Sequence, residues 1–422
     1  MTIVKNYKDL SFTNERKLVL DLIEKAYESI QPRKVVGENI SLTNSNILYI
    51  KDAPIDLSKY KNIYLLGFGK GASVISKLVE EKLGDLLTDG YVIDIMEEKF
   101  SKIKFTKGTH PLPSKENFDF ANMVLQKFSN LTKNDLVITI VCGGGSSLFE
   151  APYSLSLKQK TEIDSAILKS GMDIYQMNTV RKHLSKVKGG FFAKTVYPAS
   201  IINLIFSDVL GNDISFIASG PSVIDETTIT DAINLKNKFG IKIDDKYFTE
   251  TPKNEKYFNN VFNFLILTND TPIDSIDREA NRVGIKTFVY SKTISCDAKT
   301  LGEKLIQKTP QGTLLIAGGE SFVNVKGKGR GGRNQEVVLG ALLNIEKNIV
   351  ISSFGTDGWD NYTLAGAIGD INTVKKAKDL NLDMKKYLID DNTLPFFEKT
   401  KDGIITGKLP SNVSDIMIVY RH

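Results

Sequence analysis

Short apolar runs alternate with segments of helical spacing along this chain of 422 residues, and most of the runs are followed within two residues by glycine. Continuous apolar runs are typical of strands that are buried on both faces. Runs of this kind lie at 61–66, 136–141, 200–206, 313–317 and 348–353. Their alternation with helical segments predicts an α/β fold with a mainly parallel sheet. Because ligands of such sheets bind beyond the carboxyl ends of the strands, we expect a binding site in the glycine-rich segments that follow the runs.

The length of the chain is sufficient for two or three domains. A boundary is expected within 240–260, a stretch that is rich in Lys, Asp and Asn and has little periodicity. We therefore predict two α/β domains, at 1–248 and 249–422. The second is expected to start with a strand at 261–267, and residues 322–325 are expected to pair back on the strand before them.

The overall charge balance argues against several classes of partner. With 55 Lys and Arg against 50 Asp and Glu, the net charge of +5 is small for this length. There is no long basic tract with interleaved aromatic residues, so we expect no nucleic-acid partner. The chain contains no apolar run of 18 residues, so we expect no membrane span. The two cysteines, Cys142 and Cys296, are too few for a disulfide framework, which favours a reducing, cytoplasmic location.

A basic, glycine-rich stretch stands out at Lys326–Glu336, where eleven residues contain four glycines and four cationic side chains. It leads directly into a helical pattern at 337–343. Glycine lets backbone N–H groups approach a ligand, and a helix N-terminus attracts anions. With Arg330 and Arg333, the stretch predicts a site for a polyanion, most plausibly a phosphorylated one. The alternative, a flexible and solvated basic loop, has equal weight when the stretch is considered alone.

Two further glycine-rich turns follow predicted strands. In the first, Gly67 and Gly69 could begin a dinucleotide-binding fingerprint, but Lys70 at the helix entrance suits a phosphate or carboxylate better. The second, Gly143–Ser147, offers consecutive N–H groups as a phosphate cradle, with close helix–strand packing as the alternative. Ser146 lacks the G-x-S-x-G context of a nucleophile, and the chain has only three histidines.

Acidic residues lie just beyond the predicted strands at Asp208, Asp213, Glu320, Asp357 and Asp360. Phosphoryl transfer needs Mg²⁺ on one or two carboxylates, cationic groups near the transferred phosphoryl, and an acceptor for the hydroxyl proton. The residues present match these needs. Each aspartate could instead cap a helix or a turn.

Taken together, these motifs resemble the type II glycerate kinases, two-domain proteins whose C-terminal part is called the MOFRL domain. The resemblance covers nearly the whole chain, in family order. The matching segments lie at 67–72, 109–113, 143–147, 178–185, 188–190, 207–213, 218–222, 318–320, 327–336, 355–358, 365–367, 406–407, 412–413 and 415.

The resemblance implies a kinase that uses ATP and Mg²⁺ to phosphorylate D-glycerate, typically on the 2-hydroxyl, a step that in some archaea belongs to a non-phosphorylative Entner–Doudoroff route. It also implies a Rossmann-like first domain, a smaller second domain and an active site in the cleft between them. We expect a monomer or homodimer. The sequence motifs do not distinguish 2- from 3-phosphoglycerate as product.

Roles for individual residues follow from the resemblance as hypotheses. Lys70 and Arg333 would hold the transferred phosphoryl group or the glycerate carboxylate, with Glu336 orienting Arg333. Asp208 or Asp357 would take the hydroxyl proton. The nucleotide would be bound by Gly67, Gly69, Gly143, Gly144, Gly145, Ser146, Ser147, Lys188, Glu320 and Asn334. Magnesium would be bound by Asp208, Asp213 and Asp357.

Some segments depart from the family pattern. Cys142 and Ser147 replace the outer residues of the usual glycine-rich motif, and segments 359–364 and 407–412 differ from it more strongly. Two other functions stay open: an NAD-dependent hydroxypyruvate reductase, which Lys70 disfavours, and a non-enzymatic nucleotide sensor.

Overall fold

The computed structural model describes residues 2–422, and the chain divides into two compact units. One, which we call the central unit because it is central in the sequence, comprises 35–266. The terminal unit combines the start of the chain, up to Lys34, with 267–422. These compact units divide at 266/267, whereas the predicted domains divide at 248/249. The reason is that the strand expected to open the second half, β9 (Val261–Leu267), instead joins the sheet of the central unit beside β8 (Ser200–Phe206).

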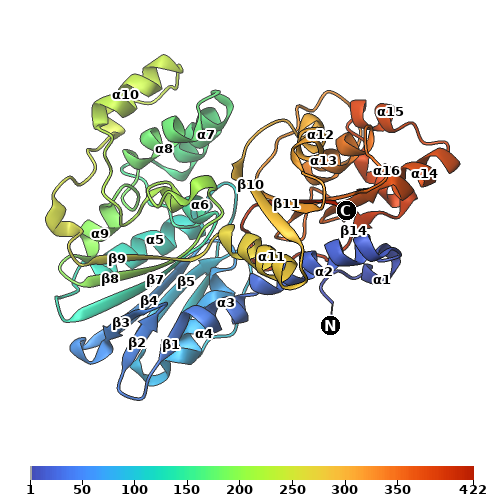
Figure 1. Cartoon of the computed structure of the whole chain (residues 1–422). Helices are drawn as coiled ribbons and strands as arrows, with labels where there is room; N and C mark the ends of the chain where they lie inside the picture. Colours follow the sequence, from blue (N-terminus) through green and yellow to red (C-terminus); the bar gives the residue numbers. More distant parts are fainter. Residues whose placement is uncertain (1) are drawn as a thin grey trace. The chain divides into compact units, whose positions relative to one another are not determined.

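The central unit is built on a six-stranded sheet in the order β6-β5-β4-β7-β8-β9 (Figure 1). Counted from β4, this is the order 3-2-1-4-5-6 of doubly wound dinucleotide-binding folds. All neighbours from β6 to β8 pair in parallel. The chain reverses its direction of strand addition between β4 and β7, and ligands of such sheets bind at this switch point. The other strands are β4 (Asn62–Phe68), β5 (Asp89–Asp94), β6 (Ile103–Lys107) and β7 (Asp135–Val141).

Helices connect and cover these strands. Three of them begin with a capping box, in which the N-cap side chain and the side chain three positions later bond reciprocally to backbone N–H groups. The helices are α4 (Ala72–Leu83), α5 (Lys115–Phe128), α6 (Gly145–Leu148), α7 (Leu157–Lys169), α8 (Ile174–Lys182), α9 (Phe191–Val196) and α10 (Ile229–Lys238). Helices α7, α8 and α10 share an apolar cluster of their own, which includes Ile167, Val180 and Ala232.

A small antiparallel sheet precedes β4 and was not predicted. It consists of β1 (Ile40–Leu42), β2 (Ile47–Ile50) and β3 (Ala53–Asp56), in sequence order. The helix α3 (Pro32–Asn39) leads into it.

The sheet of the terminal unit is mixed, with the order β10-β11-β15-β12-β13-β14. Only β10 and β11 pair in parallel, and the other neighbours are antiparallel. The last strand of the chain lies in the middle, so that Asp415 at its start is in register with Gly319 on one side and Gly355 on the other. The strands are β10 (Lys286–Ile294), β11 (Thr313–Gly319), β12 (Ile349–Gly355), β13 (Gly366–Asp370), β14 (Gly403–Ile404) and β15 (Asp415–Arg421). The strand predicted at 322–325 does not form, since Phe322 makes only an isolated bridge to Asp297.

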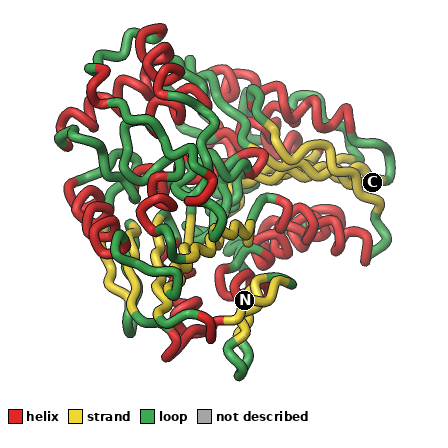
Figure 2. Tube along the Cα trace, turned by 90° about the vertical axis from the view of Figure 1, so that its left-hand side faces the viewer, coloured by secondary structure: helices red, strands yellow, loops and turns green. Residues whose placement is uncertain are grey.

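Helices lie on both faces of this sheet (Figure 2). The first helices, α1 (Tyr7–Leu10) and α2 (Asn14–Ser29), precede α3, and α2 packs with α11 (Asp270–Arg282) over one face. Helices α12 (Ala298–Lys308) and α13 (Arg333–Leu342) pack on the other. The unit also contains α14 (Ile371–Asp379), α15 (Met384–Ile389) and α16 (Thr393–Thr400).

A buried arginine joins helix α2 to the C-terminal part of the terminal unit. The side chain of Arg16 on α2 is fully buried. It donates to Asp370 at 2.8 and 3.0 Å, to Asp402 at 2.8 Å and to Thr373 at 2.7 Å. Paired, hydrogen-bonded geometry of this kind is what makes a buried charge tolerable.

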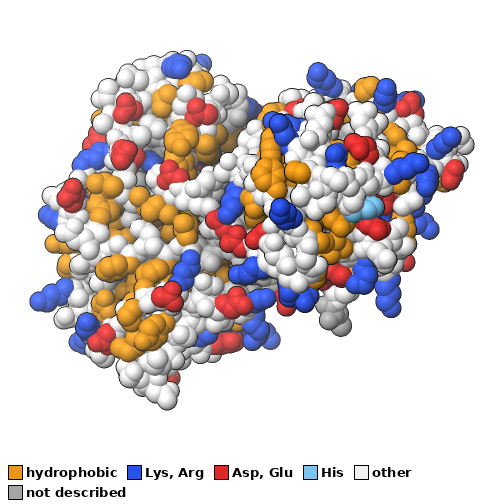
Figure 3. Space-filling model, in the orientation of Figure 1, with side chains coloured by type: hydrophobic (Ala, Val, Ile, Leu, Met, Phe, Trp, Pro, Cys, Tyr) orange, Lys and Arg blue, Asp and Glu red, His pale blue; other side chains and the backbone are white. Residues whose placement is uncertain are grey.

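The surface agrees with the small net charge. On the face in Figure 3, basic and acidic side chains are interspersed with apolar ones. No helix formed by residues 2–422 has the length and apolar character that a membrane span requires.

Candidate active site

Two glycine-rich turns of the central unit are bonded together at the switch point of its sheet. The N–H of Cys142 after β7 donates to the carbonyl of Phe68 at 3.0 Å, and the N–H of Lys70 donates to the carbonyl of Gly143 at 2.8 Å. Gly69 has φ +115°, and a β-carbon there would lie 2.4 Å from the carbonyl oxygen of Cys142. The turn after β4 thus needs a glycine so that the two turns can approach.

Three chemically active side chains gather around the second turn. A β-carbon on Gly144 would lie 2.8 Å from Cδ2 of His110 and 3.4 Å from Cε of Lys70, and one on Gly143 would lie 2.0 Å from a carboxylate oxygen of Asp208. Burial lowers the pKa of His110, and the nearby Lys70 lowers it further. The structure thus brings two of the predicted residues, Lys70 and Asp208, to one turn and adds His110.

The serines of this turn have defined partners. Ser147 donates from its hydroxyl to the carbonyl of Pro111 at 2.5 Å. The hydroxyls of Ser146 and Ser219 are 3.1 Å apart, and Ser219 donates to Oδ1 of Asn178 at 2.8 Å. This polar chain connects the turn to α8 and was not predicted.

Two residues expected to bind nucleotide have close contacts within the protein. A β-carbon on Gly67 would lie 2.4 Å from the hydroxyl of Ser76 and 2.9 Å from Val92, so this glycine allows α4 to pack on the sheet. Lys188 is buried, and its ammonium lies 2.6 Å from Glu150. Burial raises the pKa of Glu150, but Lys160 and Lys188 outweigh burial and bring it to about 2. We therefore reassign Lys188 from ligand binding to a buried ion-pair network.

In the terminal unit, Arg333 lies between two carboxylates. Its Nε and Nη2 donate to Asp415 at 2.6 and 3.1 Å, and its Nη2 and Nη1 donate to Glu320 at 3.1 and 3.3 Å. Burial raises the pKa of Asp415 to about 7, even though Arg333 acts in the opposite direction. Glu320 is partly exposed, whereas Asp415 is buried. Asp415 was not among the predicted site residues. Its place among the segments that match the family was the signal that could have identified it.

The start of α13 is capped by Asp360. This buried carboxylate accepts the backbone N–H of Asn334 at 3.1 Å and of Gln335 at 3.0 Å. It also accepts from the side chain of Gln335 at 3.0 Å. The oxygen of the Asn334 side chain accepts from Ser353 at 2.5 Å. The helix terminus that the sequence suggested for an anion is thus occupied by the protein itself. The buried Asn334 is hydrogen-bonded to Asp360 and Ser353, so we reassign it to a structural role.

The glycines of the basic stretch serve close packing. β-Carbons on Gly327 and Gly329 would lie 2.1 and 2.5 Å from the carbonyl oxygen of Asp390, and one on Gly331 would lie 2.1 Å from Oγ1 of Thr393. The N–H groups of Lys326 and Gly327 donate to Asp391 at 2.7 and 2.6 Å. The backbone of the stretch therefore packs against the segment between α15 and α16. In this packed arrangement the backbone forms neither an open cradle for a polyanion nor a flexible loop.

Glu336 does not orient Arg333, whose acidic partners are Asp415 and Glu320. The Glu336 side chain is buried, and within residues 2–422 its Oε2 has no hydrogen-bond partner. Burial raises its pKa to about 7. Lys299 acts in the opposite direction, and Asp391 adds to the rise.

The two segments that depart most from the family pattern meet in space. The ammonium of Lys408 lies 4.5 Å from the ring centroid of Trp359. The N–H of Leu409 donates to the carbonyl of Asp357 at 2.8 Å. Asp357 itself accepts the N–H of Trp359 at 3.0 Å. The changed residues therefore form one surface beside a predicted site aspartate.

The predicted metal ligands do not form one cluster. Asp213 is exposed and accepts the N–H of Ser215 at 2.9 Å, which closes a turn after β8. Among residues 2–422, no group of three or more His, Cys, Asp and Glu side chains has an arrangement that could hold a metal ion by itself. Mg²⁺ commonly takes only one or two carboxylates, with the remaining ligands from water and substrate phosphates. A single carboxylate, such as that of Asp208 or that of Asp357, is sufficient for that kind of site.

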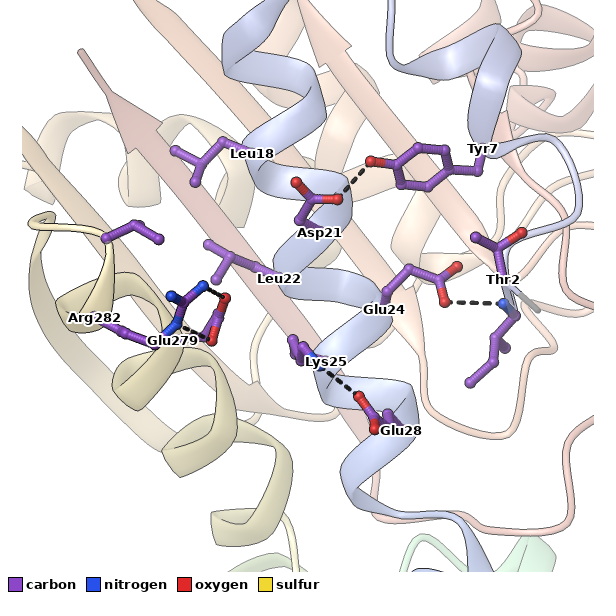
Figure 4. A pocket seen from close by; sticks show the side chains of 12 residues that line it. Thr2, Tyr7, Leu18, Asp21, Leu22, Glu24, Lys25, Glu28, Glu279 and Arg282 are labelled. Carbon is purple, nitrogen blue, oxygen red and sulfur yellow. Dashed lines mark hydrogen bonds and ion pairs between the residues drawn. The ribbon is translucent and has the colours of Figure 1, made fainter.

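A groove elsewhere in the terminal unit has a different character. It has a volume of about 670 Å³ and is lined mainly by α2 and α11 (Figure 4). Its charged side chains bond to one another, as in the pairs Lys25–Glu28 at 2.8 Å and Arg282–Glu279 at 2.7 Å. These charges are satisfied within the protein, so the groove does not compete with the switch-point turns as a site for a charged substrate.

A doubly wound sheet with a lysine and an aspartate at its switch point, joined to a second α/β unit, defines a two-unit enzyme class that handles anionic ligands. Comparison with known proteins agrees. Residues 18–248 match the family described as "Domain of unknown function (DUF4147)", and residues 313–415 match the MOFRL family. The chain belongs to the type II glycerate kinase family, which combines these two regions.

Several relatives are similar over nearly their whole length. The chain is 33% identical to a D-glycerate 2-kinase of Thermotoga maritima, covering 96% of this chain and 97% of the relative. It is 32% identical to a glycerate 2-kinase of Picrophilus torridus, covering 99% of each. The crystal structure of a glycerate kinase from Thermotoga maritima superposes with a TM-score of 0.87 at 32% identity, covering 96% and 99% of the two chains. A putative hydroxypyruvate reductase of Agrobacterium vitis is more distant, at 28% identity over 84% of this chain and 86% of that protein.

Proposed function

We propose that this protein transfers the γ-phosphoryl group of ATP to the 2-hydroxyl of D-glycerate. The observation that carries the proposal is the convergence of Lys70, His110 and Asp208 on the Gly143–Ser147 turn at the switch point of the sheet. The relatives named glycerate 2-kinase, which match nearly the whole chain, support the choice of substrate and hydroxyl.

The residues at the turn have the chemistry that phosphoryl transfer needs. We propose that Lys70 stabilises the negative charge of the transferred phosphoryl group, because its ammonium can interact with that charge as it develops in the transition state. The N–H groups of Gly143–Ser147 would bind the nucleotide phosphates together with Gly69. Asp208 would accept the hydroxyl proton or hold Mg²⁺, and Asp357 would take the other role. When bound, Mg²⁺ neutralises phosphate charge.

Arg333 is assigned to the carboxylate of glycerate, which a guanidinium can bind at two points. Its charge is already matched by Asp415 and Glu320. A substrate anion would therefore replace Glu320, the exposed partner, while Asp415 would keep the guanidinium oriented. Glu320 then acts on substrate affinity and does not itself bind nucleotide as first expected.

The alternatives make different predictions. A hydroxypyruvate reductase would place a dinucleotide at the turn after β4, where Lys70 stands at the helix entrance. A nucleotide sensor would bind ATP without consuming it. The expected cleft between the two units, the cytoplasmic location and the monomeric or homodimeric state stay predictions.

One experiment separates these functions. The purified protein is incubated with D-glycerate, ATP and Mg²⁺, and the product is identified by phosphorus NMR. We expect ADP and 2-phosphoglycerate in equal amounts. Formation of 3-phosphoglycerate would correct the position of transfer. A change in nicotinamide absorbance with hydroxypyruvate, without formation of ADP, would overturn the kinase.

A further inference from the structure

An aromatic pair lies on the surface of the central unit near the proposed phosphate turn. The rings of Tyr175, at the start of α8, and Phe216, after β8, meet edge to face with centroids 4.2 Å apart and an interplanar angle of 69°. Tyr175 is 63% exposed, and its neighbour Ile174 is 52% exposed. The pair of Phe68 with Phe149 in the same unit is, in contrast, buried in its core. A large aromatic surface that is held in place but left uncovered is typical of a binding site.

This pair is joined to the Gly143–Ser147 turn by the polar chain already described. Asn178 follows Tyr175 by three positions on α8, so the two side chains are neighbours on one helix face. Ser219 follows Phe216 by three positions and lies in a short helical turn, Ile217–Ser219, that contacts both α6 and α8. Two hydrogen bonds, of 2.8 and 3.1 Å, then lead from Asn178 through Ser219 to Ser146. The rings therefore lie about one helical turn, roughly 5 Å, beyond a bonded path to the turn.

The backbone between the rings and the turn is strained. Ala218 and Ser219 both have left-handed conformations, with φ of 51° and 61°. Residues other than glycine rarely adopt this conformation, and such strain is concentrated at ligand clamps. Here it lets the chain turn sharply enough to place Phe216 against α8 and Ser219 against Ser146. The β-carbon of Ala218 also packs under the turn, 2.9 Å from where a β-carbon of Gly145 would lie.

We propose that Tyr175 and Phe216 are the platform on which the base of the phosphoryl-donor nucleotide stacks. This inference rests on the proposed kinase function, since the phosphates of the donor are assigned there to the Gly143–Ser147 turn. Aromatic side chains bind nucleobases through the π face that every base presents. Selection among bases by stacking alone is therefore weak. We accordingly expect ATP and GTP to have KM values within a few-fold of each other.

Steady-state kinetics provide the first test. Tyr175→Ala is expected to raise the KM for ATP about tenfold while the KM for D-glycerate stays within twofold, and Tyr175→Phe is expected to restore the wild-type value. The matched control is Tyr257→Ala, because Tyr257 belongs to another edge-to-face pair of the same unit, with Tyr197 at 5.5 Å. An unchanged KM for ATP in Tyr175→Ala, or an equal rise in the control, overturns the proposal.

Equilibrium binding separates this inference from the kinase function. Calorimetric titrations of wild type and Tyr175→Ala with ADP and with inorganic triphosphate are compared. We expect about tenfold weaker binding of ADP and unchanged binding of triphosphate. Equal losses for both ligands, or no loss for ADP, overturn the platform even if glycerate is phosphorylated. A specific loss for ADP supports the platform even if glycerate is not the acceptor. Tyr175 carries the test if Phe216→Ala fails to fold, because its ring is the more exposed.

Discussion

Arg333 and Asp415 are joined at two points, with Nε–Oδ2 and Nη2–Oδ1 distances of 2.6 and 3.1 Å. The carboxylate stands at the start of the last strand, in register with the ends of β11 and β12. A helix residue that would bind substrate is therefore oriented by a residue 82 positions later in the chain. This relationship changes what substitution of Arg333 is expected to do.

Replacing Arg333 is expected to affect both activity and stability. Arg333→Ala should lower kcat/KM by about 10²–10³-fold, the range seen when one charge-stabilising group is removed. It should also lower the free energy of unfolding by about 1–3 kcal/mol, because buried Asp415 loses its partner. Arg333→Lys should recover most of the stability but not the two-point geometry. Arg330→Ala, three positions earlier and exposed, is the control for both kinetics and denaturant unfolding. Unchanged activity in Arg333→Ala would remove this residue from the proposed site.

Replacing Lys70 is expected to affect activity alone. Lys70→Ala should reduce kcat by about 10²–10³-fold, because a preorganised positive charge near the phosphoryl group is lost. The midpoint of thermal unfolding should change little, since Lys70 is partly exposed. Turnover of D-glycerate and calorimetric unfolding measure the two effects, and Lys82→Ala, in the helix α4 that follows Lys70, is the control. A kcat within threefold of wild type would contradict the assignment.

The glycines of the basic stretch should be sensitive to substitution, whereas its exposed lysines should tolerate removal of their charge. A β-carbon on Gly329 would lie 2.5 Å from the carbonyl oxygen of Asp390, a backbone atom. We therefore expect Gly329→Ala to cost about 1–3 kcal/mol, as overpacking does. Lys328→Ala should change stability by less than about 0.5 kcal/mol and leave both KM values near wild type. A large rise in the KM for ATP in Lys328→Ala would restore the polyanion site that the sequence suggested.

Arg16 should be among the most sensitive positions for stability. Arg16→Met leaves Asp370 and Asp402 buried without their cation, so a loss of about 3–5 kcal/mol is expected. Lys17→Met is the matched control on the same helix. The exposed pair of Lys17 with Asp21 should contribute less than about 1 kcal/mol. Urea unfolding of the two variants compares them directly, and equal losses would show that burial of the ion pair does not matter.

Glu336 should make stability fall as pH rises. Its pKa is about 7 in the folded protein against an ordinary value of 4.5. Between these values the folded state holds a proton that the unfolded state has lost, so raising the pH favours unfolding. Glu336→Gln should therefore stabilise the protein by roughly 1–3 kcal/mol at pH 8 relative to its effect at pH 4.5. Unfolding of both proteins across this range measures the difference, and a constant difference would contradict the raised pKa.

The sequence predicted the parts of the fold that depend on local pattern. The apolar runs at 61–66, 136–141 and 200–206 became β4, β7 and β8. Pairing partners were not predictable in the same way. The sequence pattern of the strand at 261–267 is the same whether the strand opens a second sheet or extends the first. Only its pairing with β8 in the structure shows that it extends the first sheet. Strands β13 and β14 are short and glycine-containing, so they lack an apolar run altogether.

The candidate site shows the same division. Lys70 and Asp208 were predicted because each directly follows a strand, and strand ends of a parallel sheet converge. Lys188 was misassigned because its partner, Glu150, lies 38 positions away. The glycines at 327–332 were ambiguous for a physical reason. Because glycine has no side chain, it allows the close approach of a phosphate and of a neighbouring backbone segment equally well.

The discontinuous make-up of the terminal unit has a consequence for how the protein forms during translation. The central unit is complete in sequence once residue 266 has left the ribosome. The sheet of the terminal unit is incomplete until its middle strand, β15, has been synthesised. Arg16 cannot form its ion pairs until Asp370 and Asp402 have been synthesised. Helix α2 is thus made before the central unit and is among the last segments to reach its final partners. Until then its apolar face is exposed to chaperones and to neighbouring nascent chains.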